Sequence, residues 1–443
     1  MARPLLLEVI ERSVFGCGLM INLCNDKEKK KLAIITRTIN LFLFFLCLFY
    51  LFSSFLIVHP VLAKEEKEEI LIGSHLPLSG ALAMAGAEQK WAYERAVEDV
   101  NRMGGIYVTE YGRKLPVRLI VMDDETNPGM AAAVVERLIK RTKVDLLLSG
   151  CTGAHGVIPG MITAEKNRTY YHGSVLWVPD FLKHNFKWCT MYFFDMAQGG
   201  SLGFEVWNSL PEDQRPQKPA VFEEDTFDGK QIGDLWIVLA EKYGYRIALR
   251  ESMGMMMGAK DFTAQINEAK GAGVDAILLM ANTADTVTLV RQMKKNNYNV
   301  KFFHGWKGTW ETEFYQSLGK DADYIFCDGF WSEDYPFKGA KELGKHYFDE
   351  FGKRSVGIGL YYALCQILWQ AIEKAGTLDG AKIRRAVLDN VFETVNGTVD
   401  YDKRGIALFP LAEFQWRNGK QQIVYPLEYA QLLAMPAPPW DER

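Results

Sequence analysis

The sequence predicts an α/β protein made of two lobes, each built on a doubly wound parallel sheet. Short apolar runs rich in β-branched and aromatic residues alternate with amphipathic helices, which is the pattern of repeated βαβ units. These runs form two series, one before about residue 195 and one from about residue 220 to 330. About 380 residues follow an apolar leader, and a chain of that length exceeds what a single hydrophobic core usually holds.

The predicted strands are short runs that end at turn-forming or polar residues. They cover residues Ile70–Leu76, Val117–Met122, Val144–Ser149, Thr169–His172, Ala220–Glu223, Ile247–Arg250, Val274–Met280 and Val300–His304. Helices between them have clear starts. Asn127 precedes Pro128, which predicts an N-cap followed by proline in the first turn, and Asp261 is placed to cap a helix over Phe262–Lys270.

The last third of the chain has a different pattern. Residues 337–390 contain helical periodicity and no clear strand, so we expect these helices to cover the first sheet. Gly405–Trp416, rich in Gly, Pro and aromatic residues, is expected to be extended and to join the second lobe.

Residues 1–63 have the order of a secretory signal, with a basic cluster, an apolar core and small residues before Lys64. We expect cleavage after Ala63 and export to the periplasm. The alternative is a retained anchor, because the apolar core Leu41–Val58 approaches the length that spans a bilayer. Met20 is an alternative start of the chain.

Charge and cysteine content exclude several classes. After the leader, 44 basic residues face 51 acidic ones, and this mildly acidic balance argues against nucleic-acid binding. Four cysteines follow the leader: Cys151, Cys189, Cys327 and Cys365. The sequence is compatible with disulfides between them and with buried free thiols. The sequence contains no phosphate-binding loop, dinucleotide motif, zinc-spaced Cys/His set or Gly-x-Ser-x-Gly elbow, so we expect no cofactor and no metal.

Four segments together resemble one family of binding proteins. They are ILIGSHLPLSGALAMAG at Ile70–Gly86, NRMGGI at Asn101–Ile106, DDETNP at Asp123–Pro128 and KDFTAQI at Lys260–Ile266. In this order and spacing they are similar to the branched-chain amino-acid and amide binding proteins of ABC importers. The resemblance covers nearly all of Ile70 to about Tyr425.

The resemblance implies a type I periplasmic binding protein fold, in which three strands cross between two α/β lobes and the ligand binds in the cleft. It implies a first lobe of residues 64–195 plus 331–405 and a second of residues 196–330 plus 406–436. Residues 437–443 are then a short tail.

The same resemblance implies the ligand-binding residues. In the first lobe, Ser79, Cys151, Thr152 and Ser174 are expected to hold a ligand carboxylate through hydroxyls and backbone N–H groups at helix starts. The alternative for Ser79 and Thr152 is that they only cap helices.

In the second lobe the matching residues are Phe227, Asn282 or Thr283, and Lys307. Trp306 in the second lobe and Tyr362 in the first are further aromatic candidates. The family has a carboxylate at the position of Lys307, where it pairs with the ligand ammonium. A lysine there favours an anion or a hydrogen-bond acceptor instead. The alternative is a solvated Lys307. Ala85 stands where the family often has a large ring, which would admit a bulkier ligand.

We therefore expect a monomeric solute-binding protein without enzymatic activity. It would deliver a small carboxylate or amide, with an aromatic ligand among the options and a simple α-amino acid disfavoured, to an ABC permease with cytoplasmic ATPases. Closure about the hinge would signal the bound state. The alternatives are a ligand-sensing receptor ectodomain and an exported hydrolase that uses Cys151 with His155 or His172, or a carboxylate pair such as Asp123–Asp124.

Overall fold

The computed structural model describes residues 67–80, 82–254 and 260–443, together with 26, 27, 30, 31, 33–35, 37–39, 41 and 42. The chain divides into two units, residues 1–66 and 67–443. In the first unit the described residues are helical, and most of the predicted signal segment lies outside them. Among the described residues, no helix combines the length and apolar character needed to cross a bilayer.

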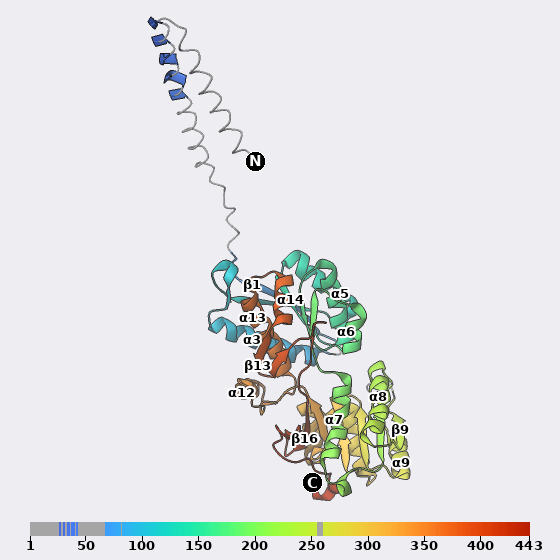
Figure 1. The fold of residues 1–443 in the computed structure, drawn as a ribbon. Helices are drawn as coiled ribbons and strands as arrows, with labels where there is room; N and C mark the ends of the chain where they lie inside the picture. The colour runs from blue at the N-terminus through green and yellow to red at the C-terminus, as the bar shows by residue number, and fades with distance from the viewer. Residues whose placement is uncertain are drawn as a thin grey trace. The chain divides into compact units, whose positions relative to one another are not determined.

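Residues 67–443 contain two large sheets, each with helices packed around it (Figure 1). In the first sheet all neighbouring strands are parallel, in the order β15-β7-β6-β5-β1-β4. Its strands are β1 (Ile70–Leu76), β4 (Val117–Asp123), β5 (Leu146–Leu148), β6 (Tyr171–Gly173), β7 (Cys189–Tyr192) and β15 (Ile406–Ala407). Its helices are α3 (Ala83–Arg102), α4 (Pro128–Arg137), α5 (Ile158–Asn167), α6 (Val178–His184), α12 (Ala340–Phe351), α13 (Ile358–Ala375) and α14 (Gly380–Asp389).

The second sheet has the order β17-β16-β12-β11-β10-β8-β9, in which β16 and β17 are antiparallel additions. Its strands are β8 (Pro219–Glu223), β9 (Leu249–Ser252), β10 (Ala276–Met280), β11 (Phe302–His304), β12 (Phe326–Gly329), β16 (Ala412–Arg417) and β17 (Lys420–Tyr425). Its helices are α7 (Met196–Ser209), α8 (Phe227–Tyr243), α9 (Thr263–Ala272), α10 (Thr283–Lys295) and α11 (Thr312–Leu318). Two small antiparallel pairs, β2 (Ile106–Val108) with β3 (Arg113–Leu115) and β13 (Val391–Thr394) with β14 (Gly397–Asp400), complete the fold.

The predicted fold class is confirmed, and the eight predicted strands all form. The predicted cap at Asn127 also forms, because its side chain accepts from Gly129 N–H and Met130 N–H. The predicted cap at Asp261 is wrong: α9 begins at Thr263 with Phe262 at the N-cap position, and Asp261, one residue earlier, accepts from Thr263 N–H at 2.9 Å. The prediction missed β17, the two small strand pairs, and the central strands β7 and β12. Strands β7 and β12 are fully buried but contain Cys, Thr, Asp or Gly, which weakens the apolar signal that identifies a strand.

Two of the predicted boundaries differ from the structure. Ile406 and Ala407 pair with β7 in the first sheet, so the chain enters the second lobe after them rather than before. The segment predicted as a tail is bound to the second lobe: Ala437 N–H donates to Lys301 O (2.8 Å), and the Trp440 indole donates to Tyr298 O (3.0 Å). Arg443 stacks on Trp440, 3.7 Å from the ring centroid, and donates to Asp321 O.

The four cysteines after the leader are free and buried, which settles the disulfide question for the described part of the chain. Each is at most 3 % exposed, and two of the sulfur atoms have polar contacts: Cys189 Sγ donates to Met161 O, and Cys327 Sγ accepts from Gln421 Nε2. They therefore contribute as small apolar residues.

Three segments cross between the lobes: residues 193–195 after β7, 330–339 after β12 and 408–411 after β15. Each brings a phenylalanine to one cluster. Phe194 lies 5.3 Å from Phe330 and 6.0 Å from Phe409 between ring centroids, and Phe193 lies 4.5 Å from Phe194. The crossing segments are thus held together by a shared aromatic core.

We predict that Phe194→Ala lowers the free energy of unfolding by about 3–5 kcal/mol, because it removes a fully buried ring from this core. Denaturant unfolding measures the change. Phe227→Ala is the matched control: this ring is 70 % exposed, so the expected change is below about 0.5 kcal/mol. Equal effects of the two substitutions would contradict the assignment of the aromatic core.

Candidate functional site

The two large sheets share one strand order, and this order indicates which loops could bind a ligand. In chain order, the first five strands of each large sheet are arranged 2-1-3-4-5. In such sheets, ligands bind outside the carboxyl ends of the strands where the order reverses, which here means β1 with β5 and β8 with β10. Most of the predicted binding residues follow these strands or their neighbours β6 and β11.

The backbone at these strand ends is unusual. Left-handed conformations occur at Thr126 (φ 56°), Thr152 (φ 60°), Val175 (φ 54°) and Trp306 (φ 38°), which follow β4, β5, β6 and β11. A positive φ is uncommon outside glycine and is unfavourable for a β-branched or bulky residue. Such strained residues persist where the surrounding structure holds them, and they concentrate at binding and active sites.

A buried hydrogen-bond network fixes the loop after β5. The His75 ring, which is fully buried, bonds the Asp124 carboxylate at 3.0 Å through Nδ1 and the Tyr171 hydroxyl at 2.9 Å through Nε2. The Tyr171 oxygen also accepts from Gly150 N–H at 2.7 Å. A Cβ at Gly150 would lie 2.3 Å from His75 Cε1, so the loop depends on glycine for this close approach.

The loop leads directly into a helix start. Residues Gly153–Val157 form one π-helical turn that continues into α5, and Thr152 O accepts from Gly156 and Val157. The Thr152 side chain makes no cap hydrogen bond. The capping alternative for Thr152 is therefore wrong, and its hydroxyl stands beside the positive end of a helix.

Ser79 and Ser174 are placed differently. Ser79 is exposed after β1, and its N–H donates to Asp123 Oδ1 at 3.2 Å, while α3 begins without a side-chain cap. Ser79 therefore does not cap α3. Ser174 is fully buried and its hydroxyl donates to Tyr192 O at 2.7 Å, so this side chain is committed to the first lobe.

Cys151 and His172 are unsuited to the hydrolase alternative. Burial, with nearby Asp124, raises the pKa of the Cys151 thiol to about 12, so the nucleophilic thiolate is absent near neutral pH. Burial lowers the pKa of His172 to about 3, and its Nδ1 already bonds Tyr170 and Thr190. Among the described residues, no group of three His, Cys, Asp or Glu side chains could hold a metal ion.

In the second lobe, Phe227 is the most open of the predicted residues. It begins α8, where the Thr226 hydroxyl caps the helix by accepting from Gly229 N–H at 3.0 Å. Asn282 caps α10 through its side-chain oxygen, which accepts from Asp285 N–H at 3.0 Å. Trp306 is buried and packs edge-on against Trp236, 5.6 Å between ring centroids.

Lys307 is not a free cation. Its ammonium lies 2.5 Å from Glu224 Oε1, and the two side chains are 24 % and 2 % exposed. The neighbouring carboxylates are paired as well: Glu223 with Arg250 at 2.8 Å and Asp225 with Lys230 at 2.6 Å. The sequence analysis considered a ligand acceptor or solvent as the partner of Lys307 and did not identify Glu224, which the strand end after β8 supplies as its counterion.

Tyr362 lies apart from these strand ends. Its hydroxyl donates to Asp99 Oδ2 at 2.9 Å, and it lines a groove between α3, α12, α13 and β13. Its neighbour Tyr361 faces the other way, with its ring 6.4 Å from Tyr93 and close to Cys151 and Glu88. The structure thus places Tyr362 away from the other predicted residues, whereas Tyr361, on another face of α13, lies near Cys151.

A second contact between the lobes lies beside the hinge. The Thr312 hydroxyl donates to Arg354 O at 3.1 Å, and the Lys353 ammonium donates to Glu313 at 3.2 Å. Glu311 lies in this contact. Burial, and then the charges of Glu88 and Glu313, raise its pKa to about 7.

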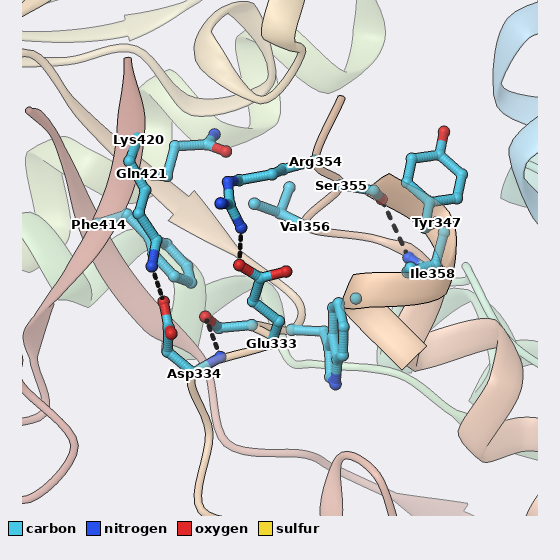
Figure 2. Close-up of a pocket in the computed structure, with 13 residues that line it drawn as sticks. Glu333, Asp334, Tyr347, Arg354, Ser355, Val356, Ile358, Phe414, Lys420 and Gln421 are labelled. Carbon is cyan, nitrogen blue, oxygen red and sulfur yellow. Dashed lines mark hydrogen bonds and ion pairs between the residues drawn. The ribbon is translucent and has the colours of Figure 1, made fainter. Parts of the chain in front are cut away.

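Figure 2 shows the crevice next to this contact, where Arg354 points to Glu333 and Lys420 to Asp334. Each charge in the crevice has its counterion within the protein, and none of the nine predicted binding residues lines it. Except for Tyr362, the predicted residues lie instead at the carboxyl ends of the strands, apart from this crevice.

Comparison with known proteins agrees with the fold. The family model described as periplasmic binding protein matches residues 69–421. The chain is 26 % identical over 364 residues to Leu/Ile/Val-binding protein homolog 1 of Brucella abortus, covering 79 % of this chain and 91 % of that one. It is 26 % identical over 355 residues to an amino acid binding protein of Pseudomonas aeruginosa, covering 76 % and 87 %.

Two solved structures share the fold. The substrate binding protein LivJ of Streptococcus pneumoniae, in complex with isoleucine, matches with a TM-score of 0.67 at 21 % identity, covering 80 % of this chain and 98 % of that one. A solute binding protein of Rhodopseudomonas palustris, in complex with 3,4-dihydroxybenzoic acid, matches with a TM-score of 0.63 at 17 % identity, covering 80 % and 95 %. One fold thus holds ligands with and without an ammonium group.

We predict that Lys307→Met lowers the free energy of unfolding by about 1–3 kcal/mol, because Glu224 would keep a buried carboxylate without its cation. The expected loss of stability is smaller than for breaking a fully buried ion pair, because the Lys307 side chain is partly exposed. The double variant Lys307→Met with Glu224→Gln is the control and should recover most of the loss. If Lys307→Met is as stable as the wild type, Lys307 does not neutralise a buried Glu224 and is a solvated side chain.

We also predict a pH dependence from Glu311. Its carboxyl has a pKa of about 7 in the folded protein and an ordinary value of 4.5, so the folded state binds more protons between these values. Stability should therefore fall as pH rises from about 4.5 to about 7, and Glu311→Gln should flatten that slope. Unfolding midpoints across the pH range measure it, with the exposed Glu212→Gln as control. An unchanged slope in Glu311→Gln would contradict the prediction.

Proposed function

The chain belongs to the periplasmic binding protein family, and from this premise we propose that it captures a small carboxylate lacking an α-ammonium group and delivers it to an ABC importer. The family is one of solute-binding proteins and not of enzymes. A permease and cytoplasmic ATPases are the proposed partners, and the proposed location is outside the cytoplasmic membrane.

The observation that carries the proposal is the pairing of charges at the end of β8. A ligand ammonium needs a carboxylate that can accept it. Glu223, Glu224 and Asp225 are each paired with a lysine or arginine, so an ammonium would meet a carboxylate whose charge is already balanced and would be repelled by the cation beside it. Glu224 Oε2 is the one oxygen of the Lys307–Glu224 pair without a hydrogen-bond partner. A neutral or anionic ligand group avoids this repulsion.

The first lobe supports a carboxylate. The start of the helix at Gly153, beside Thr152, offers backbone N–H groups and a positive dipole end, and the His75 network keeps the loop in place. A rigid donor set holds an anion with little loss of conformational freedom on binding.

Aromatic side chains support a ring on the ligand. Phe227 is open, and Trp177 and Trp310 are half-buried above the aromatic core of the hinge. Small-molecule sites are mostly apolar and aromatic with a few placed polar groups. An aromatic or cyclic carboxylate satisfies both sets of groups.

A branched-chain amino acid is the second candidate, favoured by the names of the relatives in Brucella and Pseudomonas. It differs from the first candidate in one feature, the ammonium group. A comparison of matched ligands with and without that group therefore separates the two.

We predict that ligand-free protein binds benzoate-type or branched aliphatic carboxylates more tightly than leucine, isoleucine or valine, as measured by calorimetry. At a ligand concentration of 100 Kd, binding should stabilise the fold by about 2.7 kcal/mol. The protein is unfolded, washed and refolded first to remove any ligand carried through purification. Tight binding of leucine, isoleucine or valine would contradict the proposed carboxylate ligand and would support a branched-chain amino acid instead.

Phe227→Ala should weaken binding of an aromatic carboxylate by about 0.5–1.5 kcal/mol, because the ring loses an aromatic partner. Tyr107→Ala, which alters a ring that is 42 % exposed on β2, is the matched control and should bind normally. If Phe227→Ala and the wild type bind equally well, the open ring is not part of the site.

A further inference from the structure

The peptide of Gly150, in the loop after β5, is held from two sides by buried side chains. Its N–H donates to the Tyr171 hydroxyl at 2.7 Å, and its carbonyl oxygen accepts from Gln89 Nε2 at 3.2 Å. Tyr171 is in β6 and Gln89 is in α3, and both are fully buried. Gln89 also donates to Ser149 O at 3.1 Å. These bonds fix the backbone two residues before Thr152.

The Tyr171 hydroxyl joins this peptide to a longer chain of hydrogen bonds. It lies 2.9 Å from His75 Nε2, and His75 Nδ1 lies 3.0 Å from Asp124 Oδ2. With a neutral imidazole, one arrangement of protons satisfies both contacts: the Tyr171 O–H donates to Nε2, and Nδ1–H donates to the carboxylate. The three side chains belong to residues that are at most 1 % exposed, so water does not compete for these bonds.

The chain continues to the loop that carries Ser79. Asp124 Oδ1 accepts from Thr126 N–H at 3.1 Å, and the Thr126 hydroxyl donates to Ser79 O at 3.0 Å. The approach is close, because a Cβ at Gly80 would lie 2.7 Å from Thr126 Oγ1. The loops after β1 and β5 are thus connected through one continuous set of hydrogen bonds.

We propose that Tyr171 is a positioning residue for ligand binding, which orients the backbone N–H groups at Thr152 and Gly153 toward a ligand carboxylate. This inference rests on the proposed function, because it requires the carboxylate to bind at this helix start. Backbone donors hold an anion well when their direction is set before binding, since ordering the loop on binding would cost affinity. The Tyr171 hydroxyl sets that direction through Gly150, without touching the ligand.

The neighbouring Tyr170 provides a matched control. It is also fully buried, and its hydroxyl lies 2.9 Å from His172 Nδ1 and 2.7 Å from Thr190 Oγ1. Neither partner is in the loop after β5. Phenylalanine at either position keeps the ring and removes the hydroxyl, so both variants should lose similar stability. Only Tyr171→Phe should affect the loop.

The first measurement is hydrogen exchange of the Gly150 amide in the ligand-free protein, followed by NMR. In Tyr171→Phe this amide loses its acceptor, and its exchange should become about three- to tenfold faster than in the wild type. Tyr170→Phe should leave it unchanged. Exchange of the α8 amides in the second lobe is the internal reference for global unfolding. Equal exchange of the Gly150 amide in the two variants, after this reference is applied, would overturn the proposal.

The second measurement is calorimetry with benzoate and with leucine, which both carry a carboxylate. Tyr171→Phe should bind whichever probe the wild type binds about three- to tenfold more weakly, whereas Tyr170→Phe should bind it as the wild type does. Equal affinity of Tyr171→Phe and the wild type would overturn the role of Tyr171 in binding even if the Gly150 amide exchanges faster. A wild-type protein that binds neither probe contradicts the proposed function instead, and the exchange measurement still decides whether Tyr171 positions the loop.

Discussion

Phe194 packs against Phe330 and Phe409, and this contact joins the three segments that pass between the lobes. The three crossings come from distant parts of the chain, so their relative positions depend on packing rather than on local sequence. Trp306 and Trp177 extend the same core toward the strand ends, at 6.3 Å and 5.1 Å from Phe194. The aromatic core therefore determines where the loops after β6 and β11 lie.

The strand ends built on this core divide the chemistry between the lobes. The first lobe presents backbone donors at Thr152 and Gly153, held by a buried His75 network. The second lobe presents an open ring at Phe227 and a neutralised pair, Lys307 with Glu224. Because each charge near β8 is already balanced, selectivity is expected to depend on shape, ring contacts and the carboxylate. Net ligand charge at the second lobe has a smaller role.

Local patterns in the sequence were sufficient for most of the fold. Apolar runs located eight strands, and Asn127 identified a helix start because capping depends on neighbours in the chain. Long-range partners were not predictable: Lys307 and Glu224 are 83 residues apart, and only the register of β8, β10 and β11 brings them together. Tyr361 and Tyr362 show a different limit. Adjacent helix positions differ by about 100°, so an error of one residue moves a side chain to another surface.

The most direct test of the proposed ligand class is to identify the small molecule that the protein carries when it is isolated from its own cell. Native mass spectrometry of the intact protein, followed by release and analysis of the bound small molecule, measures it without a chosen panel. We expect a carboxylate that lacks an α-ammonium group and carries a ring or a bulky apolar group. Recovery of leucine, isoleucine or valine would contradict this expectation. The protein would then bind a ligand ammonium although the carboxylates near β8 are already paired with cations.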